Sequence, residues 1–167
     1  MHKAYIGIGS NLENPRQQIA QAIKALQLIA EDGKINCSSI YQSTAMTNQE
    51  CTAQITKQQD YLNAAVCINT KKSALELLED LKKIEISQGR ERKTERWAAR
   101  TLDLDLLLFD DQIIDHPCLT VPHYGLTQRN FVIYPLVDLD ANLMLPNGTT
   151  IRELYQACSS TGIQKIE

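Results

Sequence analysis

Apolar residues alternate with polar ones in some parts of the chain and recur at a helical period in others. Alternation and short apolar runs predict strands at residues 4–9, 35–43, 61–69 and 102–109. Residues 44–59 are polar and follow neither period, so we predict a long loop there. Long loops without secondary structure often carry function, which makes this segment a candidate part of a site.

Two longer segments have the helical period. The first begins at Asn14 and Pro15, an N-cap residue followed by a residue favoured in the first helical position. The second begins with a capping box, in which Ser73 and Glu76 bond each other's backbone, and it extends as far as Gly89. Both segments are amphipathic, so each helix is expected to pack one face on a sheet.

The order strand, helix, two strands, helix, strand is typical of an α+β fold. We predict a ferredoxin-like βαββαβ core, in which helices flank an antiparallel sheet, followed by a C-terminal extension with a short helix at 151–158. A chain of 167 residues is long enough to bury a substantial core. Residues 1–167 are therefore expected to form a single domain.

Two carboxylates interrupt the last predicted strand. Asp103 and Asp105 share one face with Leu107 and Phe109, while the leucines at 102, 104, 106 and 108 share the other. The two aspartates lie roughly 7 Å apart along the strand, and their repulsion is about 2 kcal/mol at an effective dielectric constant of ~20. A Mg²⁺ ion that also binds substrate phosphates would compensate this repulsion. The alternative is a solvated strand face.

A basic segment precedes the aspartates. Residues 90–100 contain five of the 17 basic residues of a chain whose net charge is −3. Arginine side chains beside a carboxylate pair suit a polyphosphate that carries its own metal ion. The spacing of Arg92, Arg96 and Arg100 also fits a solvated helix end. Trp97 lies within the segment and either stacks on a ring or belongs to the core.

Composition sets broad limits. The chain is 43% hydrophobic and 22% charged, as in ordinary globular proteins, and a pI near 5.6 argues against a general nucleic-acid binder. Five cysteines without a C-x-x-C pair indicate free thiols in a reducing compartment, so we predict a cytoplasmic protein. Neither a signal peptide nor an apolar run of membrane-spanning length is present in the sequence.

Several weaker sequence features bear on which ligands the protein could bind. Gly7-x-Gly9 lacks the third glycine of a dinucleotide fingerprint and a Walker A motif is absent, so a nucleotide would bind without a P-loop. Tyr61 and Asn63 share a strand face and suit a flat heterocycle, although an interior Tyr–Asn pair is as common. His123, considered alone, is a surface or core histidine.

These residues together resemble one family, the 6-hydroxymethyl-7,8-dihydropterin pyrophosphokinases of folate biosynthesis. The resemblance covers residues 5 to about 136. Its segments are Tyr5-Ile6-Gly7-Ile8-Gly9-Ser10-Asn11-Leu12, Asp60-Tyr61-Leu62-Asn63-Ala64-Ala65-Val66, Ile84-Glu85, Gly89-Arg90-x-Arg92, Arg96-Trp97-x-x-Arg100-Thr101-Leu102-Asp103-Leu104-Asp105, Val121-Pro122-His123-Tyr124 and Arg129-x-Phe131. The R-T-L-D-L-D segment is highly specific to that family.

The resemblance implies transfer of pyrophosphate from ATP to the pterin hydroxymethyl group, with release of AMP. We expect a cytoplasmic monomer that binds neither nucleic acid nor membrane. Asp103 and Asp105 would hold two Mg²⁺ ions and, with Arg90 and Arg92, would be the catalytic residues. The implied ATP-binding residues are Glu85 and Thr120 on the nucleoside side and Arg92, Arg100, His123, Tyr124 and Arg129 around the triphosphate and ribose. Tyr61 and Phe131 would sandwich the pterin, Asn63 would read its polar edge, and Trp97 would close over the site.

Some positions depart from the family pattern: Ala98-Ala99 replaces a usual Gly-Pro, and Cys118 occupies a position that often holds an arginine. Two other classes remain as alternatives. A nucleic-acid-binding module would need a basic face with exposed aromatic residues, and a non-catalytic pterin or nucleotide sensor would not need the aspartate pair. We also expect residues 44–59 and 90–100 to close over bound ATP.

Overall fold

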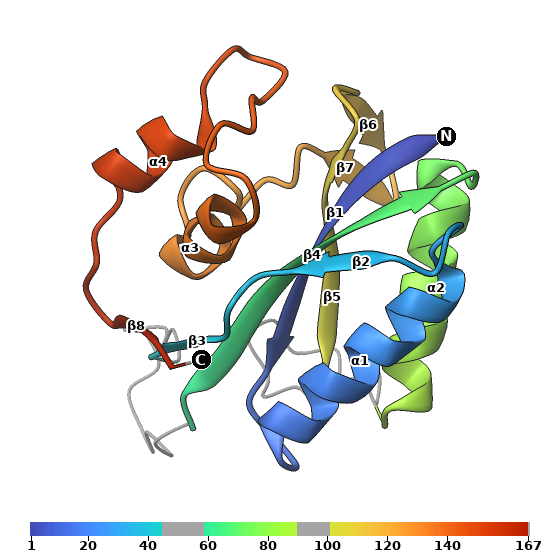
Figure 1. The fold of residues 1–167 in the computed structure, drawn as a ribbon, viewed down its shortest axis with the longest axis horizontal. Coiled ribbons are helices and arrows are strands. Elements are labelled where there is room, and N and C mark those ends of the chain that lie inside the picture. Colours follow the sequence, from blue (N-terminus) through green and yellow to red (C-terminus); the bar gives the residue numbers. More distant parts are fainter. Residues whose placement is uncertain (45–58, 90–100, 167) are drawn as a thin grey trace.

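An antiparallel sheet lies between two layers of helices (Figure 1). The structure is a computed structural model and describes residues 1–44, 59–89 and 101–166. Its elements are β1 (His2–Ser10), α1 (Pro15–Ile29), β2 (Ile35–Cys37), β3 (Tyr41–Ser43), β4 (Tyr61–Thr70), α2 (Ala74–Ser87), β5 (Asp103–Phe109), β6 (Ile114–His116), β7 (Leu119–Val121), α3 (Asn130–Leu139), α4 (Ile151–Ala157) and β8 (Ile163–Lys165).

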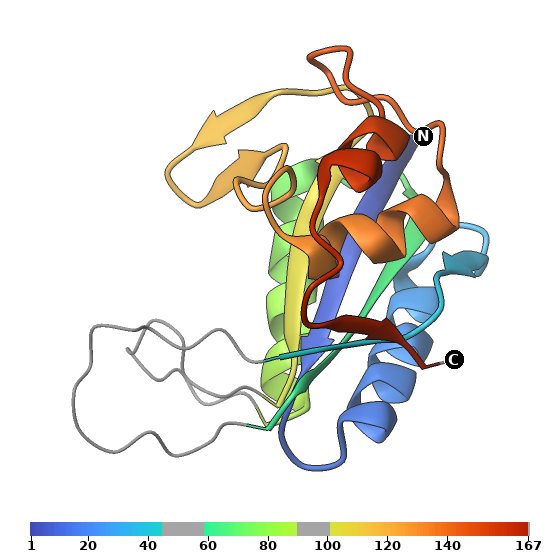
Figure 2. The same cartoon turned by 90° about the vertical axis from the view of Figure 1, so that its left-hand side faces the viewer.

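The strands of the main sheet follow the order β5-β1-β4-β3-β8, and β2 also pairs with β4. All of these pairs are antiparallel. β6 and β7 form a separate hairpin that projects beyond the main sheet (Figure 2). The predicted mixture of helices and an antiparallel sheet is therefore confirmed. Among the described helices, none is long and apolar enough to cross a membrane.

Each face of the sheet covers its own apolar core. The face that carries Ile6 and Val66 packs on α1 and α2, through residues such as Leu26 and Leu81. The opposite face packs on α3 and α4, where the buried residues are Tyr5, Ala65, Cys67, Leu107, Leu108, Leu126, Leu136, Leu145 and Ile151. Burial on both sides explains why the central strands are almost continuously apolar.

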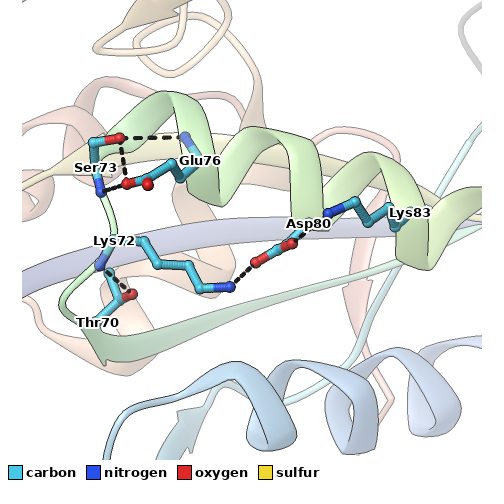
Figure 3. Close-up of polar contacts among 6 residues, drawn as sticks. All are labelled: Thr70, Lys72, Ser73, Glu76, Asp80 and Lys83. Carbon is cyan, nitrogen blue, oxygen red and sulfur yellow. Dashed lines mark hydrogen bonds and ion pairs between the residues drawn. The ribbon is translucent and has the colours of Figure 1, made fainter.

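The capping box predicted for α2 is present (Figure 3). The Ser73 backbone N–H donates to Glu76 Oε2 at 2.8 Å, and the Glu76 N–H donates to Ser73 Oγ at 3.4 Å. One turn later, Asp80 forms ion pairs with Lys72 and Lys83. α1 begins at Pro15 as predicted, but Asn14 does not cap it with its side chain, because its backbone is left-handed with φ 62°.

The strand predicted at 35–43 is divided into β2 and β3. Ser38 lies between them, and its hydroxyl accepts a hydrogen bond from the Ala65 N–H at 2.9 Å. The next residue, Ser39, donates its backbone N–H to Asp138 of α3 at 2.9 Å. The Ser38 N–H still donates to the Ala65 carbonyl at 2.9 Å, so the serine hydroxyl replaces one bond of the ladder at this point. The apolar pattern did not reveal this interruption.

The predicted alternation along β5 is correct as far as Leu107 and wrong for Leu108 and Phe109. Tyr5 of β1 pairs with Leu108, whereas Ile6 pairs with Leu106, so the register passes over Leu107. This β-bulge puts Leu107 and Leu108 on the α3 face and returns Phe109 to the α1–α2 core. Leu108 does not share a face with Leu106, and Phe109 does not share one with the aspartates.

The C-terminal part contains the predicted short helix, α4, together with elements that the pattern did not predict. α3 was missed because Pro135 lies inside a helix that is apolar on most of its surface. β8 returns to the main sheet and pairs with β3 (Figure 2), where the Thr44 N–H donates to the Gly162 carbonyl at 3.0 Å. β8 therefore covers what would otherwise be the open edge of β3.

Candidate active site

The strand register places the predicted site residues in rows on the α3 face of the sheet. Gly9 pairs with Asp103 on one side and with Asn63 on the other. In the neighbouring row Gly7 lies between Asp105 and Ala65. Because glycine has no side chain, the surface of β1 stays low at Gly9, between Asp103 and Asn63. At Gly7 the Leu107 side chain occupies this space, since a Cβ there would lie 3.3 Å from Leu107 Cδ1. The rows form a shallow floor with acidic groups on one side and an amide on the other.

His123 lies against the aspartate pair because of the bulge in β5. The backbone N–H of His123 donates to the carbonyl of Leu107, the bulged residue, at 3.0 Å. This bond brings His123 Nε2 to 3.9 Å from Asp105 Oδ2. Bulges often redirect side chains next to active sites. Here the bulge connects the segment after β7 to the strand that carries the carboxylates.

The hydrogen bonds of His123 fix which ring nitrogen carries the proton. The Gly125 N–H donates to Nδ1 at 3.1 Å, so Nδ1 must be unprotonated and Nε2 carries the proton of the neutral ring. Burial lowers the pKa of His123, the positive charge of Arg129 lowers it further, and Asp103 opposes both effects. His123 therefore presents an Nε2–H donor toward the acidic end of the site at neutral pH.

The aspartate pair fits a hard cation that takes further ligands from elsewhere. Asp105 is 42% exposed, which leaves its carboxylate accessible. The described residues contain no group of three or more His, Cys, Asp or Glu side chains able to enclose a metal ion. Mg²⁺ is typically bound by one or two carboxylates together with water and substrate phosphates. Asp103 and Asp105 are therefore suited to Mg²⁺ that arrives with a phosphate ligand.

Arg129 lies over the aromatic residues beside it in the chain. Its guanidinium carbon is 4.9 Å from the centre of the Tyr124 ring and 5.8 Å from that of Phe131, and Nη2 donates to the Tyr124 hydroxyl at 3.1 Å. A Cβ at Gly125 would lie only 2.7 Å from Arg129 Cδ and Nε. Glycine at this position therefore lets Arg129 lie across both rings. Of these, Tyr124 is a predicted ATP-binding residue and Phe131 a predicted pterin-binding residue.

Tyr61 and Asn63 lie on the same face of β4, as the alternation predicted. Asn63 is buried, with its Nδ2 donating to Ser43 Oγ at 2.8 Å. Phe131 lies in the first turn of α3, which packs on β4 and β3. The three residues predicted to bind a pterin thus come from two elements that are packed together. The interior Tyr–Asn alternative holds for Asn63 only, since Tyr61 is half-buried.

Thr120 lies on β7 of the projecting hairpin and is exposed, as is Cys118 just before the strand. Tyr124 is 63% exposed. The hairpin leads directly into His123, whose Nε2 lies 3.9 Å from Asp105 Oδ2. Four further predicted residues, Arg90, Arg92, Trp97 and Arg100, lie outside the described residues, as does nearly all of the predicted loop at 44–59 and its closure over ATP.

Glu85 has a contact that the sequence did not predict. It is a buried residue of α2, and its Oε1 accepts the Leu104 backbone N–H at 2.8 Å. Leu104 lies between the two aspartates on β5, which is the edge strand of the sheet. The carboxylate thus satisfies an edge N–H that no neighbouring strand reaches. Its placement on the nucleoside side remains a prediction.

Replacing Glu85 by leucine is expected to lower the free energy of unfolding by about 1–3 kcal/mol, because the Leu104 N–H loses its acceptor. Glu85→Gln retains an oxygen and should cost less. Denaturant unfolding of both variants tests this, and Glu79→Leu, at an exposed position of the same helix, is the control. Equal stability of the leucine and glutamine variants would contradict the importance of the bond.

Two residues at the end of β1 were missed as contributors to the site. Ser10 and Asn11 are fully buried. Ser10 Oγ donates to the Thr101 carbonyl at 2.5 Å, and Asn11 Nδ2 donates to the Gln59 carbonyl at 3.2 Å. These bonds tie the end of β1 to the chain just before β5 and just before β4. A Ser-Asn pair directly after an apolar strand was the available signal.

Comparisons with known proteins agree on one family. The family model described as 7,8-dihydro-6-hydroxymethylpterin-pyrophosphokinase matches residues 5–141. A Pseudomonas aeruginosa protein named 2-amino-4-hydroxy-6-hydroxymethyldihydropteridine pyrophosphokinase is 39% identical over 166 residues, which are 99% of this chain and 98% of the relative. A Haemophilus influenzae protein of the same name is 43% identical over 156 residues, which are 93% of this chain and 92% of the relative.

A solved structure supports the fold. The crystal structure of a Plasmodium falciparum HPPK-DHPS variant with pterin and p-hydroxybenzoate superposes with a TM-score of 0.71 at 16% identity. The aligned region covers 93% of this chain and 43% of the solved chain, so this chain spans less than half of the solved one. At this identity the similarity concerns the fold alone.

Proposed function

Because this chain belongs to the 7,8-dihydro-6-hydroxymethylpterin-pyrophosphokinase family, we propose that it transfers pyrophosphate from ATP to the hydroxymethyl group of 6-hydroxymethyl-7,8-dihydropterin. The products are AMP and the pterin diphosphate, an intermediate of folate biosynthesis. The observation that carries this proposal is the row of Asp103, Gly9 and Asn63. It places a carboxylate and an amide on either side of a glycine, which has no side chain to separate them.

We assign the acidic side of the row to the metal ions. Asp103 and Asp105 would hold Mg²⁺, two ions by analogy with the family, together with phosphate oxygens of bound ATP. When bound, Mg²⁺ neutralises phosphate charge and lowers the pKa of a hydroxyl that coordinates it. The His123 Nε2–H, which faces Asp105, donates to a phosphate oxygen. Support comes from the exposure of Asp105 and from the acceptor role of His123 Nδ1.

The side of the site that carries the arginines binds the triphosphate and the ribose of ATP. Arg129 and Tyr124 contact the triphosphate and ribose, with Thr120 and Glu85 nearer the nucleoside. Arg90, Arg92 and Arg100 stabilise charge on the transferred group, and arginine is suited to this because its planar fork matches phosphate oxygens. The chain needs no covalent intermediate, since positioning and charge neutralisation account for most of the catalysis of such transfers.

The pterin lies on the other side of the row. Tyr61 and Phe131 stack on its two faces, Asn63 hydrogen-bonds its polar edge, and Trp97 covers the bound ring. The packing of α3 on β4 supports this arrangement, because it brings the elements of Tyr61 and Phe131 together. The hydroxymethyl group then points along the floor toward the aspartates.

The finer architectural predictions belong to the same proposal. The order β5-β1-β4-β3, with α1 and α2 on one face, supports a ferredoxin-like core to which the segment from β6 onward is a C-terminal extension. We further propose that residues 1–167 act as one domain. A monomeric state and a cytoplasmic location stay predictions from the sequence.

Incubation of the protein with ATP, Mg²⁺ and the hydroxymethyl-dihydropterin tests the reaction directly. We expect AMP and the pterin diphosphate to appear together, and chelation of Mg²⁺ to stop the reaction. Release of ADP would contradict pyrophosphoryl transfer. Pterin binding without any turnover would favour the non-catalytic sensor, for which the aspartate pair would have no purpose.

A further inference from the structure

Asn63 is a buried amide with one end held and the other end open. Only 5% of the residue is exposed. Nδ2 donates to Ser43 Oγ at 2.8 Å and lies 3.5 Å from the Tyr41 carbonyl oxygen, so both contacts of the nitrogen are with β3. Within the part of the chain that the structure describes, Oδ1 accepts no hydrogen bond. Part of the surface of this oxygen is open to solvent, so it can accept a hydrogen bond from a ligand.

The amide oxygen faces the bare backbone of β1. A Cβ built at Gly9 would lie 3.7 Å from Asn63 Oδ1, and no other side chain of the described residues would lie within 4 Å of that Cβ. The oxygen therefore opens onto the floor between β4 and β5, on the side where Asp103 lies. It offers a hydrogen-bond acceptor to whatever occupies the floor.

The hydroxyl that holds the nitrogen is itself fixed. Ser43 is 4% exposed and pairs with Tyr61 of β4 on one side and with Ile163 of β8 on the other. The C-terminal strand thus holds β3 in place from its outer edge, and Lys165 adds an ion pair with Asp138 at 3.1 Å. Ser43 Oγ is consequently a preorganised acceptor for the Asn63 amide.

We propose that Ser43 is a positioning residue, which sets the orientation of the Asn63 amide so that its oxygen receives an N–H donor of the bound heterocycle. The nitrogen and oxygen of an amide have nearly the same shape, so only hydrogen bonds decide which way it points. The Tyr41 carbonyl can only accept, and the Ser43 hydroxyl accepts the shorter bond, so the nitrogen faces β3 and the oxygen faces the floor. The edge of a pterin carries amino and ring N–H donors that match this acceptor. The inference rests on the proposed function.

Pterin affinity of Ser43 variants tests the inference. Without the hydroxyl the amide nitrogen keeps only its 3.5 Å contact with the Tyr41 carbonyl, so the amide is held less firmly and can turn its donor toward the donors of the pterin. Ser43→Ala should therefore weaken binding roughly tenfold. Ser43→Thr keeps the hydroxyl and should restore affinity to near the original value. Calorimetric titration of 6-hydroxymethyl-7,8-dihydropterin, in the presence of Mg²⁺ and a non-hydrolysable ATP analogue, measures both. The affinity for the analogue should stay unchanged.

Ser38→Ala is a matched control, because the Ser38 hydroxyl also bonds β4, at the Ala65 N–H, without touching Asn63. It should lower stability to a similar extent and leave pterin affinity unchanged. A positioning role further requires that Ser43→Ala has no added effect when Asn63 is already alanine.

The assignment would be overturned if Ser43→Ala bound the pterin with wild-type affinity. It would also be overturned if the losses of pterin affinity caused by Ser43→Ala and Asn63→Ala added up in the double variant. A loss of pterin affinity in Ser38→Ala as large as in Ser43→Ala would overturn it as well. If the unmodified protein failed to bind the pterin at all, the proposed function itself would be wrong, and this outcome is distinct from the others.

Discussion

Replacing either Asp103 or Asp105 by alanine is expected to abolish Mg²⁺-dependent turnover, by roughly a thousandfold or more, while the protein stays folded. Each change removes a carboxylate that we assign to the metal ions. It also removes the repulsion between two carboxylates roughly 7 Å apart, which is about 2 kcal/mol at an effective dielectric constant of ~20. The free energy of unfolding without metal should therefore be unchanged or higher.

Product analysis with varied Mg²⁺ measures the first effect, and thermal unfolding with and without Mg²⁺ and nucleotide measures the second. Asp111→Ala is the control, since Asp111 is an exposed aspartate two residues after the end of β5. It should retain turnover and metal-dependent stabilisation. Near-normal turnover in either variant of the pair would refute the metal assignment.

Alanine in place of Tyr61 or Phe131 is expected to weaken pterin binding by about one to two orders of magnitude, since stacking of a heterocycle on an aromatic ring contributes roughly 1–3 kcal/mol. ATP affinity should change little in Tyr61→Ala. Phe131→Ala is a less selective change, because Arg129 lies over this ring as well as over Tyr124.

Calorimetry with each ligand separates the two pockets. Tyr155→Ala serves as the control, because Tyr155 is a partly exposed aromatic residue of α4 that contacts Tyr134. Loss of ATP binding with intact pterin binding would mean that the pockets are assigned the wrong way round.

Helices and strands that have two different faces were predictable from the sequence. The period of α1 and α2 and the capping box of Ser73 and Glu76 are local signals, and the structure confirms them. The faces of Leu108 and Phe109 at the end of β5 were not predictable. Both faces of that segment are apolar and buried, so no polar residue marks the bulge at Leu107. α3 was hidden for a related reason, because its composition is apolar throughout and contains Pro135.

The sequence by itself determined the chemical identity of the candidate site. Two aspartates in alternate positions, and Tyr61 with Asn63 on one strand face, follow from the period of a strand alone. The tertiary structure decided how these groups are held. The bulge docks His123 beside Asp105, Glu85 binds the backbone between the aspartates, and β8 secures the strand of Ser43. Each of these contacts joins residues far apart in the chain, and a local pattern cannot encode such a contact because it depends on how whole elements pack.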